Sequence, residues 1–222
     1  MDSDDSTAGP PRVRVLVVDD HEMFASSLAH VLDAEDDLVT VGVAGTIARA
    51  GELIRSTDPD VLLLDHRLPD GDGVSSIGEL RALRPDLAVV VLTASAADHV
   101  LVAAIEAGAS GFVSKTRGIG EVTAAVRAAA SGESVISPEL LARLLPRLHR
   151  GGSAGHQELT EREREVLGLL AEGMTNASIA ERLVVSVHTV RNHIANLSAK
   201  LGAHSKLEAL AIAVREGLLP DL

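Results

Sequence analysis

The stretch VRVLVVDD, residues 13–20, decides the fold, because a short and almost wholly apolar run ends there in two aspartates. Runs of this kind are typical of strands that are buried on both faces, as in a parallel sheet covered by helices. Four similar runs follow: LVTVGVA (38–44), DVLLLD (60–65), LAVVVLT (87–93) and GFVSK (111–115). The segments 23–35, 46–56, 74–84, 98–107 and 118–131 are each long enough for a helix. Five such units predict a doubly wound α/β domain.

The pattern changes after residue 131, and from Leu159 onward only helices are expected. Thr160 and Glu163 have the spacing of a capping box, and Gly173 ends that helix. A short helix is expected at 176–183 and another at 205–216. Between them a helix starts after Ser186 and ends at Gly202, with one apolar stripe formed by Val190, Ile194, Leu197 and Leu201. A small all-α domain of four helices is therefore expected.

These patterns divide the chain into a first domain at 12–131, a linker at 132–156 and a second domain at 157–222. The linker contains the sequence GGSAG (151–155), which is typical of a flexible connection. Its first part allows a helix that is broken at Pro146.

The composition excludes several classes of protein. The 222 residues contain no cysteine, so a disulfide framework and a thiolate zinc site are excluded. The N-terminus is acidic without an apolar core, and the longest uncharged apolar run, 87–97, is too short to span a bilayer. We therefore expect a cytoplasmic protein with no membrane segment. The net charge is −12, but Arg182 to Leu207 contains no acidic residue, so a local basic face is expected within an acidic protein.

Polar residues follow four of the expected strands: Asp19, Asp20, Asp65, Thr93 and Lys115. The carboxyl ends of parallel strands meet at one edge of the sheet, where ligands bind. Three carboxylates at this edge predict a Mg²⁺ site, because all-oxygen ligands suit that ion. A carboxylate can also attack a phosphoryl group, which assigns Asp65 as a nucleophile beside the metal-binding aspartates. Taken singly, an aspartate at a strand end is more often a cap or turn residue, and a lone lysine a surface charge.

The motifs VRVLVVDDHEMF, VLLLDHRLPDGDG, VVVLTA and GASGFVSK resemble the receiver domain of two-component response regulators, over about residues 12–131. The resemblance implies a flavodoxin-like fold and a sensor histidine kinase that phosphorylates Asp65. It implies that Mg²⁺ is bound by Asp19, Asp20, Asp65 and the backbone carbonyl of Arg67. Thr93, Lys115 and Phe112 are the implied switch residues, although Phe112 is equally well explained as a core aromatic. The Asp70–Gly73 segment lacks the rest of a calcium-binding loop and is interpreted as a turn.

The third helix of the second domain offers hydrogen-bond donors opposite its apolar stripe. Arginine can read guanine and asparagine can read adenine in the major groove, so Arg191 and Asn192 are candidate DNA contacts. Ser186 and Thr189, near the helix start, can bind phosphate. The alternative is a solvated helix face in an interaction module.

Residues 157–219 resemble the LuxR-type DNA-binding domain of the NarL/FixJ subfamily of response regulators. The resemblance implies that Arg191, Asn192 and Ala195 face base edges of double-stranded DNA and that Lys200 lies near the backbone. Ala195 stands where the family often has a polar residue, which leaves fewer direct base contacts. His193 is interpreted as a structural residue, with a contact to a DNA phosphate as the alternative. A homodimer on activation, with the last helix as its surface, and a contact with RNA polymerase are further expectations.

Two alternatives remain open. One is an aspartate-nucleophile phosphohydrolase, but such enzymes usually carry a second carboxylate two residues after the nucleophile, where this chain has Arg67. The other is a regulator that works without phosphorylation. A dinucleotide-binding enzyme is disfavoured, because the first strand is followed by DDHEMF and not by a glycine-rich turn. No enzymatic turnover is expected beyond slow self-dephosphorylation.

Overall fold

A computed structural model describes residues 12–94, 97–115, 118–144, 147 and 158–219. The first domain is built on a five-stranded sheet in the order β2-β1-β3-β6-β7, with every neighbouring pair parallel. The strands are β1 (Val13–Val18), β2 (Leu38–Ala44), β3 (Val61–Asp65), β6 (Ala88–Thr93) and β7 (Gly111–Ser114). The doubly wound fold expected from the sequence is confirmed, and each strand lies within one residue of the predicted run.

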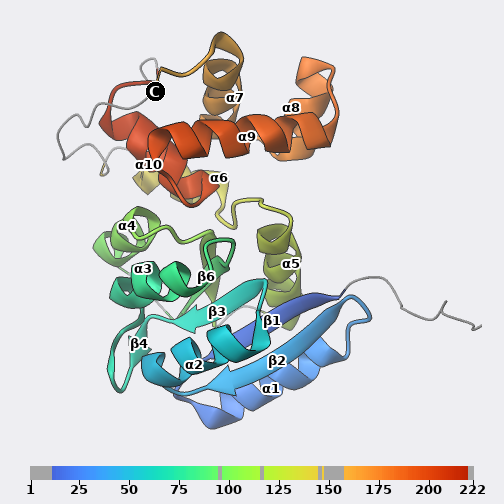
Figure 1. The fold of residues 1–222 in the computed structure, drawn as a ribbon, viewed down its shortest axis with the longest axis vertical. Coiled ribbons are helices and arrows are strands. Elements are labelled where there is room, and N and C mark those ends of the chain that lie inside the picture. The colour runs from blue at the N-terminus through green and yellow to red at the C-terminus, as the bar shows by residue number, and fades with distance from the viewer. Residues whose placement is uncertain (1–11, 95–96, 116–117, 145–146, 148–157, 220–222) are drawn as a thin grey trace, which may run out of the picture.

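Helices cover both faces of this sheet (Figure 1). They are α1 (Glu22–Asp33), α2 (Ile47–Thr57), α3 (Gly73–Leu83), α4 (Asp98–Glu106) and α5 (Ile119–Ala130). Successive residues of a strand point to opposite faces. Val15 and Val17 accordingly pack in a core with α1 and α5, whereas Leu16 and Val18 pack in a core with α2, α3 and α4.

A small hairpin follows the central strand β3 and was not predicted. It consists of β4 (Arg67–Leu68) and β5 (Gly71–Asp72), which pair antiparallel. The carboxylate of Asp70 accepts hydrogen bonds from the amides of Ile47 and Ala48 at the start of α2, and these bonds lower its pKa. Asp72 caps α3. Both aspartates therefore hold the start of a helix. The turn interpretation is correct at Asp70, whereas Gly71 and Asp72 form β5 and Gly73 begins α3.

The second domain contains α7 (Glu161–Ala171), α8 (Asn176–Leu183), α9 (Val187–Leu201) and α10 (Lys206–Arg215). The capping box of Thr160 and Glu163 is present, and the expected stripe on α9 is buried. A further short helix, α6 (Pro138–Leu144), lies in the linker. Residues 148–157, including the GGSAG stretch, lie outside the described residues. No helix in the described ranges is long and apolar enough to cross a membrane.

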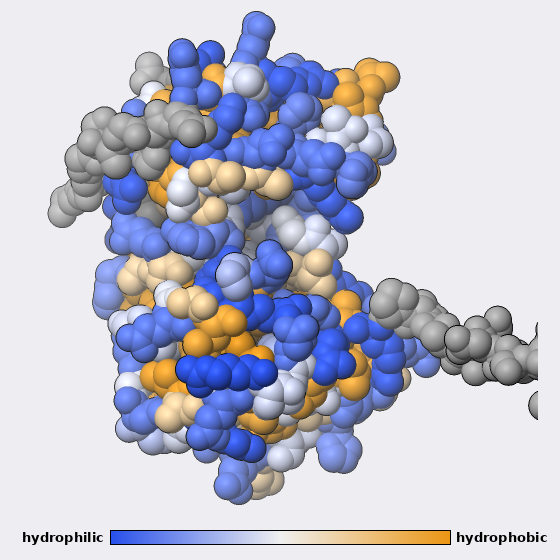
Figure 2. Space-filling view, in the orientation of Figure 1, coloured by the Kyte–Doolittle hydropathy of each residue, from blue (hydrophilic) through white to orange (hydrophobic). Residues whose placement is uncertain are grey.

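The two domains share an apolar contact. Leu101 and Ile105 of α4 and Leu141 and Leu144 of α6 belong to the same buried cluster as the core of the helical domain. Seven of the ten residues of α10 are buried, as expected for a helix that is apolar on most sides. Because of this burial, the face of α10 expected to form a dimer is covered within the chain. Figure 2 shows a mainly hydrophilic surface on both lobes.

Candidate functional sites

Strand ends bring the acidic residues together at the carboxyl edge of the sheet. Asp19 follows β1 and Asp65 ends β3; both side chains are buried. The ammonium Nζ of Lys115, just after β7, lies 2.5 Å from Oδ2 of Asp19 and 2.7 Å from Oδ2 of Asp65. Three segments distant in sequence therefore meet in one charged cluster.

The charge of Lys115 is stabilised by this cluster. Burial alone would lower the pKa of Lys115, but hydrogen bonds to Asp19 and Asp65 outweigh burial and raise it. The ammonium also lies 5.2 Å from the ring centroid of Phe24, a cation–π contact that the sequence did not suggest.

The donor set of this pocket fits a divalent cation. Potential ligand atoms of Asp19, Asp20, His21 and Asp65 all lie within 4.8 Å of one another. Most of them are carboxylate oxygens, which hard cations prefer. His21 was not predicted; its ring Nδ1 lies 2.8 Å from Oδ1 of Asp20 and 3.2 Å from Oδ1 of Asp19. His66 was also missed, and its Nδ1 lies 3.3 Å from Oδ1 of Asp65.

The remaining predicted residues of the first domain surround this cluster. Thr93 ends β6, pairs with Ser114 in the sheet and is 8% exposed, and among the described residues its hydroxyl has no partner. Arg67 lies in β4, and its amide points toward Oδ1 of Asp65 at 3.5 Å. Phe112, in β7, is half-buried between the core on α4 and the apolar contact with the helical domain.

Gly73 determines how closely the loop after Asp65 can return to the strand. Its amide donates to the carbonyl of His66, 3.0 Å away. A Cβ at this position would lie only 2.1 Å from the carbonyl oxygen of Asp65. Glycine is therefore required here for a steric reason, and it fixes the backbone at the pocket.

The candidate nucleic-acid face lies on α9. Ser186 caps this helix: its hydroxyl accepts from the amide of Thr189 and lies 2.8 Å from the hydroxyl of Thr189. Arg191, Asn192 and Ala195 are exposed, on the side away from the buried stripe. The side chains that could read bases therefore share one helix surface.

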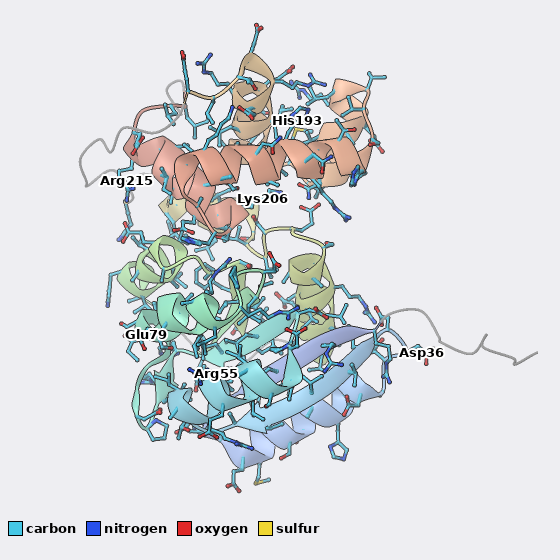
Figure 3. The ribbon with its side chains drawn as sticks, viewed as in Figure 1. Asp36, Arg55, Glu79, His193, Lys206 and Arg215 are labelled. Carbon is cyan, nitrogen blue, oxygen red and sulfur yellow. The ribbon has the colours of Figure 1, made fainter. Side chains whose placement is uncertain are left out.

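Lys200 and His193 are less exposed than these residues. The ammonium of Lys200 forms an ion pair with Glu163 at 2.7 Å, which joins α9 to the start of α7. Its contact is thus internal to the helical domain. His193 is half-buried on α9, and Figure 3 labels its position.

The face of α9 that carries Arg191 and Ala195 is turned toward the first domain. Both residues line a cavity of about 740 Å³ between the domains, together with Arg12, Arg81 and Glu133. Arg81 also joins the domains, because its guanidinium donates to the carbonyls of Gly108 and His204 at 2.8 and 2.5 Å. The two domains are therefore closed over this part of α9.

Two family models match the chain. A model of the response regulator receiver domain matches residues 15–127, and a model of bacterial regulatory proteins of the luxR family matches residues 157–213. The matches cover the pocket and α9, respectively.

Similar proteins include transcriptional regulators. The DNA-binding transcriptional activator DevR/DosR of Mycobacterium tuberculosis is 39% identical over 90% of this chain and 94% of its own length. The transcriptional regulatory protein LiaR of Bacillus subtilis is 35% identical over 93% of this chain and 99% of its own. RcsB of Salmonella enterica, solved on promoter DNA with the phosphomimetic BeF₃⁻, is 25% identical with a TM-score of 0.54, over 93% of this chain and all of that one.

Proposed function

Because the chain belongs to the LuxR family of two-component response regulators, with a receiver domain followed by a DNA-binding domain, we propose that Asp65 accepts a phosphoryl group from a sensor histidine kinase. The observation that carries this assignment is the buried carboxylate of Asp65 at the sheet edge, 2.7 Å from Lys115 and grouped with Asp19 and Asp20. Phosphorylation then controls the binding of double-stranded DNA by the helical domain.

The transfer uses the carboxylate of Asp65 as a nucleophile. One of its oxygens attacks the phosphorus of a phosphohistidine, so that the new P–O bond forms as the P–N bond breaks and the imidazole leaves. Lys115 stays protonated and donates to the oxygens of the transferred group. Asp19, Asp20, Asp65 and the backbone carbonyl of Arg67 would hold Mg²⁺, which offsets the negative charge of that group.

The hydroxyl of Thr93, which has no partner among the described residues, provides the switch. It can donate to a phosphoryl oxygen on Asp65, and this movement shifts α4. Phe112 repacks with it, because it contacts both the core on α4 and the cluster shared with the helical domain. Since α4 packs on α10, the change favours separation of the domains.

DNA reading is assigned to α9. We assign base contacts to Arg191, Asn192 and Ala195, and phosphate contacts to Ser186, Thr189 and Lys200. To contact a phosphate, the ammonium of Lys200 must break or share its ion pair with Glu163. A duplex cannot reach Arg191 and Ala195 while the first domain faces them across this cavity, because base reading requires α9 to lie inside the major groove. DNA binding therefore requires opening, which also frees the part of α10 that packs on α4 for a homodimer. A contact with RNA polymerase and a cytoplasmic location follow from transcription control.

The chain acts as a phosphoacceptor and not as a turnover enzyme. A phosphohydrolase of the aspartate type needs an acid near the leaving group, and the position two residues after Asp65 is an arginine. Slow self-dephosphorylation is the only reaction expected in addition to the transfer.

Phosphorylation is tested by intact mass after incubation with acetyl phosphate and Mg²⁺. The wild-type chain and Asp36→Asn, an exposed control, should gain one phosphoryl group, whereas Asp65→Ala should gain none. A gain that persists in Asp65→Ala would refute the assignment of the acceptor. For DNA reading, Arg191→Ala should weaken binding and relax the preference at one base position.

A further inference from the structure

Glu133 of the first domain reaches into the helical domain. It lies just after α5, and its side chain is 23% exposed. Its Oε1 accepts from the backbone amide of Asn176 at 2.9 Å, and its Oε2 accepts from Nζ of Lys206 at 3.0 Å. Both oxygens of one carboxylate are therefore held by the second domain.

The groups that hold Glu133 form a compact anion site. Asn176 is the first residue of α8, where helical amides lack intrahelical partners and the helix dipole favours an anion. Lys206, the first residue of α10, brings a positive charge to the same point and also donates to Oδ1 of Asn176 at 3.2 Å. The amide of one helix and the ammonium of another thus converge on one position.

A second observation also points to an anionic ligand. The side chain of Asn176 is buried, with 1% of the residue exposed, and among the described residues its Nδ2 has no acceptor. Asn176 lines the cavity between the domains. A buried donor beside the amide and the ammonium is suited to a ligand with more acceptor atoms than a carboxylate offers.

This anion site lies on the DNA-reading side of the domain. The same cavity is lined by Glu133, Asn176 and Lys206 and by Arg191 and Ala195 of α9. Figure 3 shows Lys206 on the side of the helical domain that faces the first domain. Proteins position themselves on a duplex mainly through phosphate contacts made by lysines and by amides at helix N-termini.

We propose that the amide of Asn176 and the ammonium of Lys206 bind one backbone phosphate of DNA, and that Glu133 occupies this site as a phosphate mimic while the domains are closed. A phosphodiester resembles a carboxylate in carrying one negative charge over two oxygens, and its two ester oxygens supply the further acceptors that Nδ2 of Asn176 lacks. The inference rests on the DNA binding and phosphorylation control proposed above, and it adds a phosphate contact outside α9.

Glu133 is also connected to β7, the strand that carries the proposed switch residue Phe112. The amide of Phe112 in β7 donates to the carbonyl of Val135 at 2.8 Å, and the amide of Val135 donates to Ser110 at 3.0 Å. The approach is so close that a Cβ at Gly111 would lie 2.3 Å from Cβ of Val135. A shift of β7 on phosphorylation therefore moves the segment that carries Glu133.

The test compares two variants that break the same ion pair. Full-length Glu133→Gln and Lys206→Gln are titrated, with and without BeF₃⁻, against a duplex selected in vitro by the wild-type chain, over a range of salt concentrations. Glu79→Gln, an exposed residue on α3, controls for loss of one acidic charge.

Glu133→Gln should tighten DNA binding by the unphosphorylated chain about tenfold, which is the effect of losing one charge-assisted hydrogen bond. Lys206→Gln should instead weaken the activated complex and reduce its salt slope by about one contact, whereas Lys206→Arg keeps it.

The opposite pattern would overturn the phosphate site. If both variants tighten binding and the slope of the activated complex stays unchanged, the pair is only an interdomain salt bridge. Should Lys206→Gln fail to fold, the amide resonance of Asn176 in Glu133→Gln decides, since it must shift when DNA is added; an unmoved resonance refutes the site. If BeF₃⁻ leaves DNA binding by the wild-type chain unchanged, the proposed control of DNA binding by phosphorylation is wrong. The comparison of unphosphorylated Glu133→Gln with the wild type still tests whether Glu133 occupies a phosphate site.

Discussion

Two partly buried lysines, Lys115 and Lys206, hold carboxylates in this molecule, and they differ in how firmly. Lys115 contacts two aspartates, which raise its pKa despite burial. Lys206 contacts one glutamate; burial lowers its pKa and the single Glu133 does not compensate. The first arrangement suits a fixed phosphoryl site, whereas the second suits a contact that is exchanged when the domains part.

The largest effect is expected at the firmly held lysine. Lys115→Gln leaves the carboxylates of Asp19 and Asp65 facing each other and should lower the free energy of unfolding by about 3 kcal/mol in metal-free buffer. Chemical denaturation measures this loss. Added Mg²⁺ should stabilise the variant more than the wild type, since a cation then separates the two charges. Equal stabilisation of both proteins would contradict the role given to Lys115.

A third pair, Lys200 with Glu163, lies within one domain and sharpens the contrast. Burial alone would raise the pKa of Glu163, but the hydrogen bonds from Lys200 and Thr160 outweigh this effect and hold the pKa below its usual value of about 4.3. Glu163→Gln should cost about 2 kcal/mol at pH 7 through the lost ion pair with Lys200, because a glutamine at this position can still accept from the amide of Thr160. The pKa of Glu163 is lower in the folded than in the unfolded protein. The stability difference between wild type and Glu163→Gln is therefore fully present above the unfolded pKa of Glu163, and it disappears as the pH falls through the folded pKa. Urea titrations from pH 7 to pH 3 check this, and a difference that grows in acid would contradict it.

The exchangeable lysine should matter less for stability. Lys206→Gln is expected to lower the free energy of unfolding by only about 1 kcal/mol, because Glu133 can turn toward solvent when its partner is lost. Thermal denaturation compares it with Lys115→Gln. A larger loss in Lys206→Gln would reverse the comparison and show that the interdomain pair is the stronger one.

The smallest effect is expected where neither lysine is involved. Val184 ends α8 with φ +55°, a region that β-branched residues avoid, and it is 90% exposed. Figure 2 shows an apolar patch over this end of the helical domain. Val184→Asn should raise the free energy of unfolding by about 0.5 kcal/mol, since asparagine tolerates this conformation. Val187→Asn, also partly exposed but helical, is the control and should not stabilise the protein.

Apart from the β4–β5 hairpin, the strands and helices could be predicted, because each has a local sequence pattern. Continuous apolar runs such as 61–64 predict strands buried on both faces, and the stripe on α9 predicts one packed helix face. The acidic pocket could also be predicted, since parallel strands deliver their ends to one edge. The structure brings Asp19, Asp20, Asp65 and Lys115 together there and places Thr93 on the neighbouring strand.

The closed arrangement could not be predicted, because it depends on single polar contacts without a period. Glu133 lies in the loop after α5 and gives no sequence signal, and Lys200 cannot be told from a surface lysine until Glu163 is placed beside it. One signal was available: the sequence LEALAIAV of α10 is apolar at almost every position, which indicates a helix covered on more than one side.

The most direct test of the account measures the distance between the domains. The chain has no cysteine, so Glu79→Cys on α3 and Glu181→Cys on α8 allow two spin labels at exposed positions. Without phosphate, double electron–electron resonance should give one narrow distance distribution; BeF₃⁻ should shift it to longer and broader distances as DNA binding rises. A distribution that stays unchanged while DNA binding rises would contradict the claim that phosphorylation acts by opening the two domains.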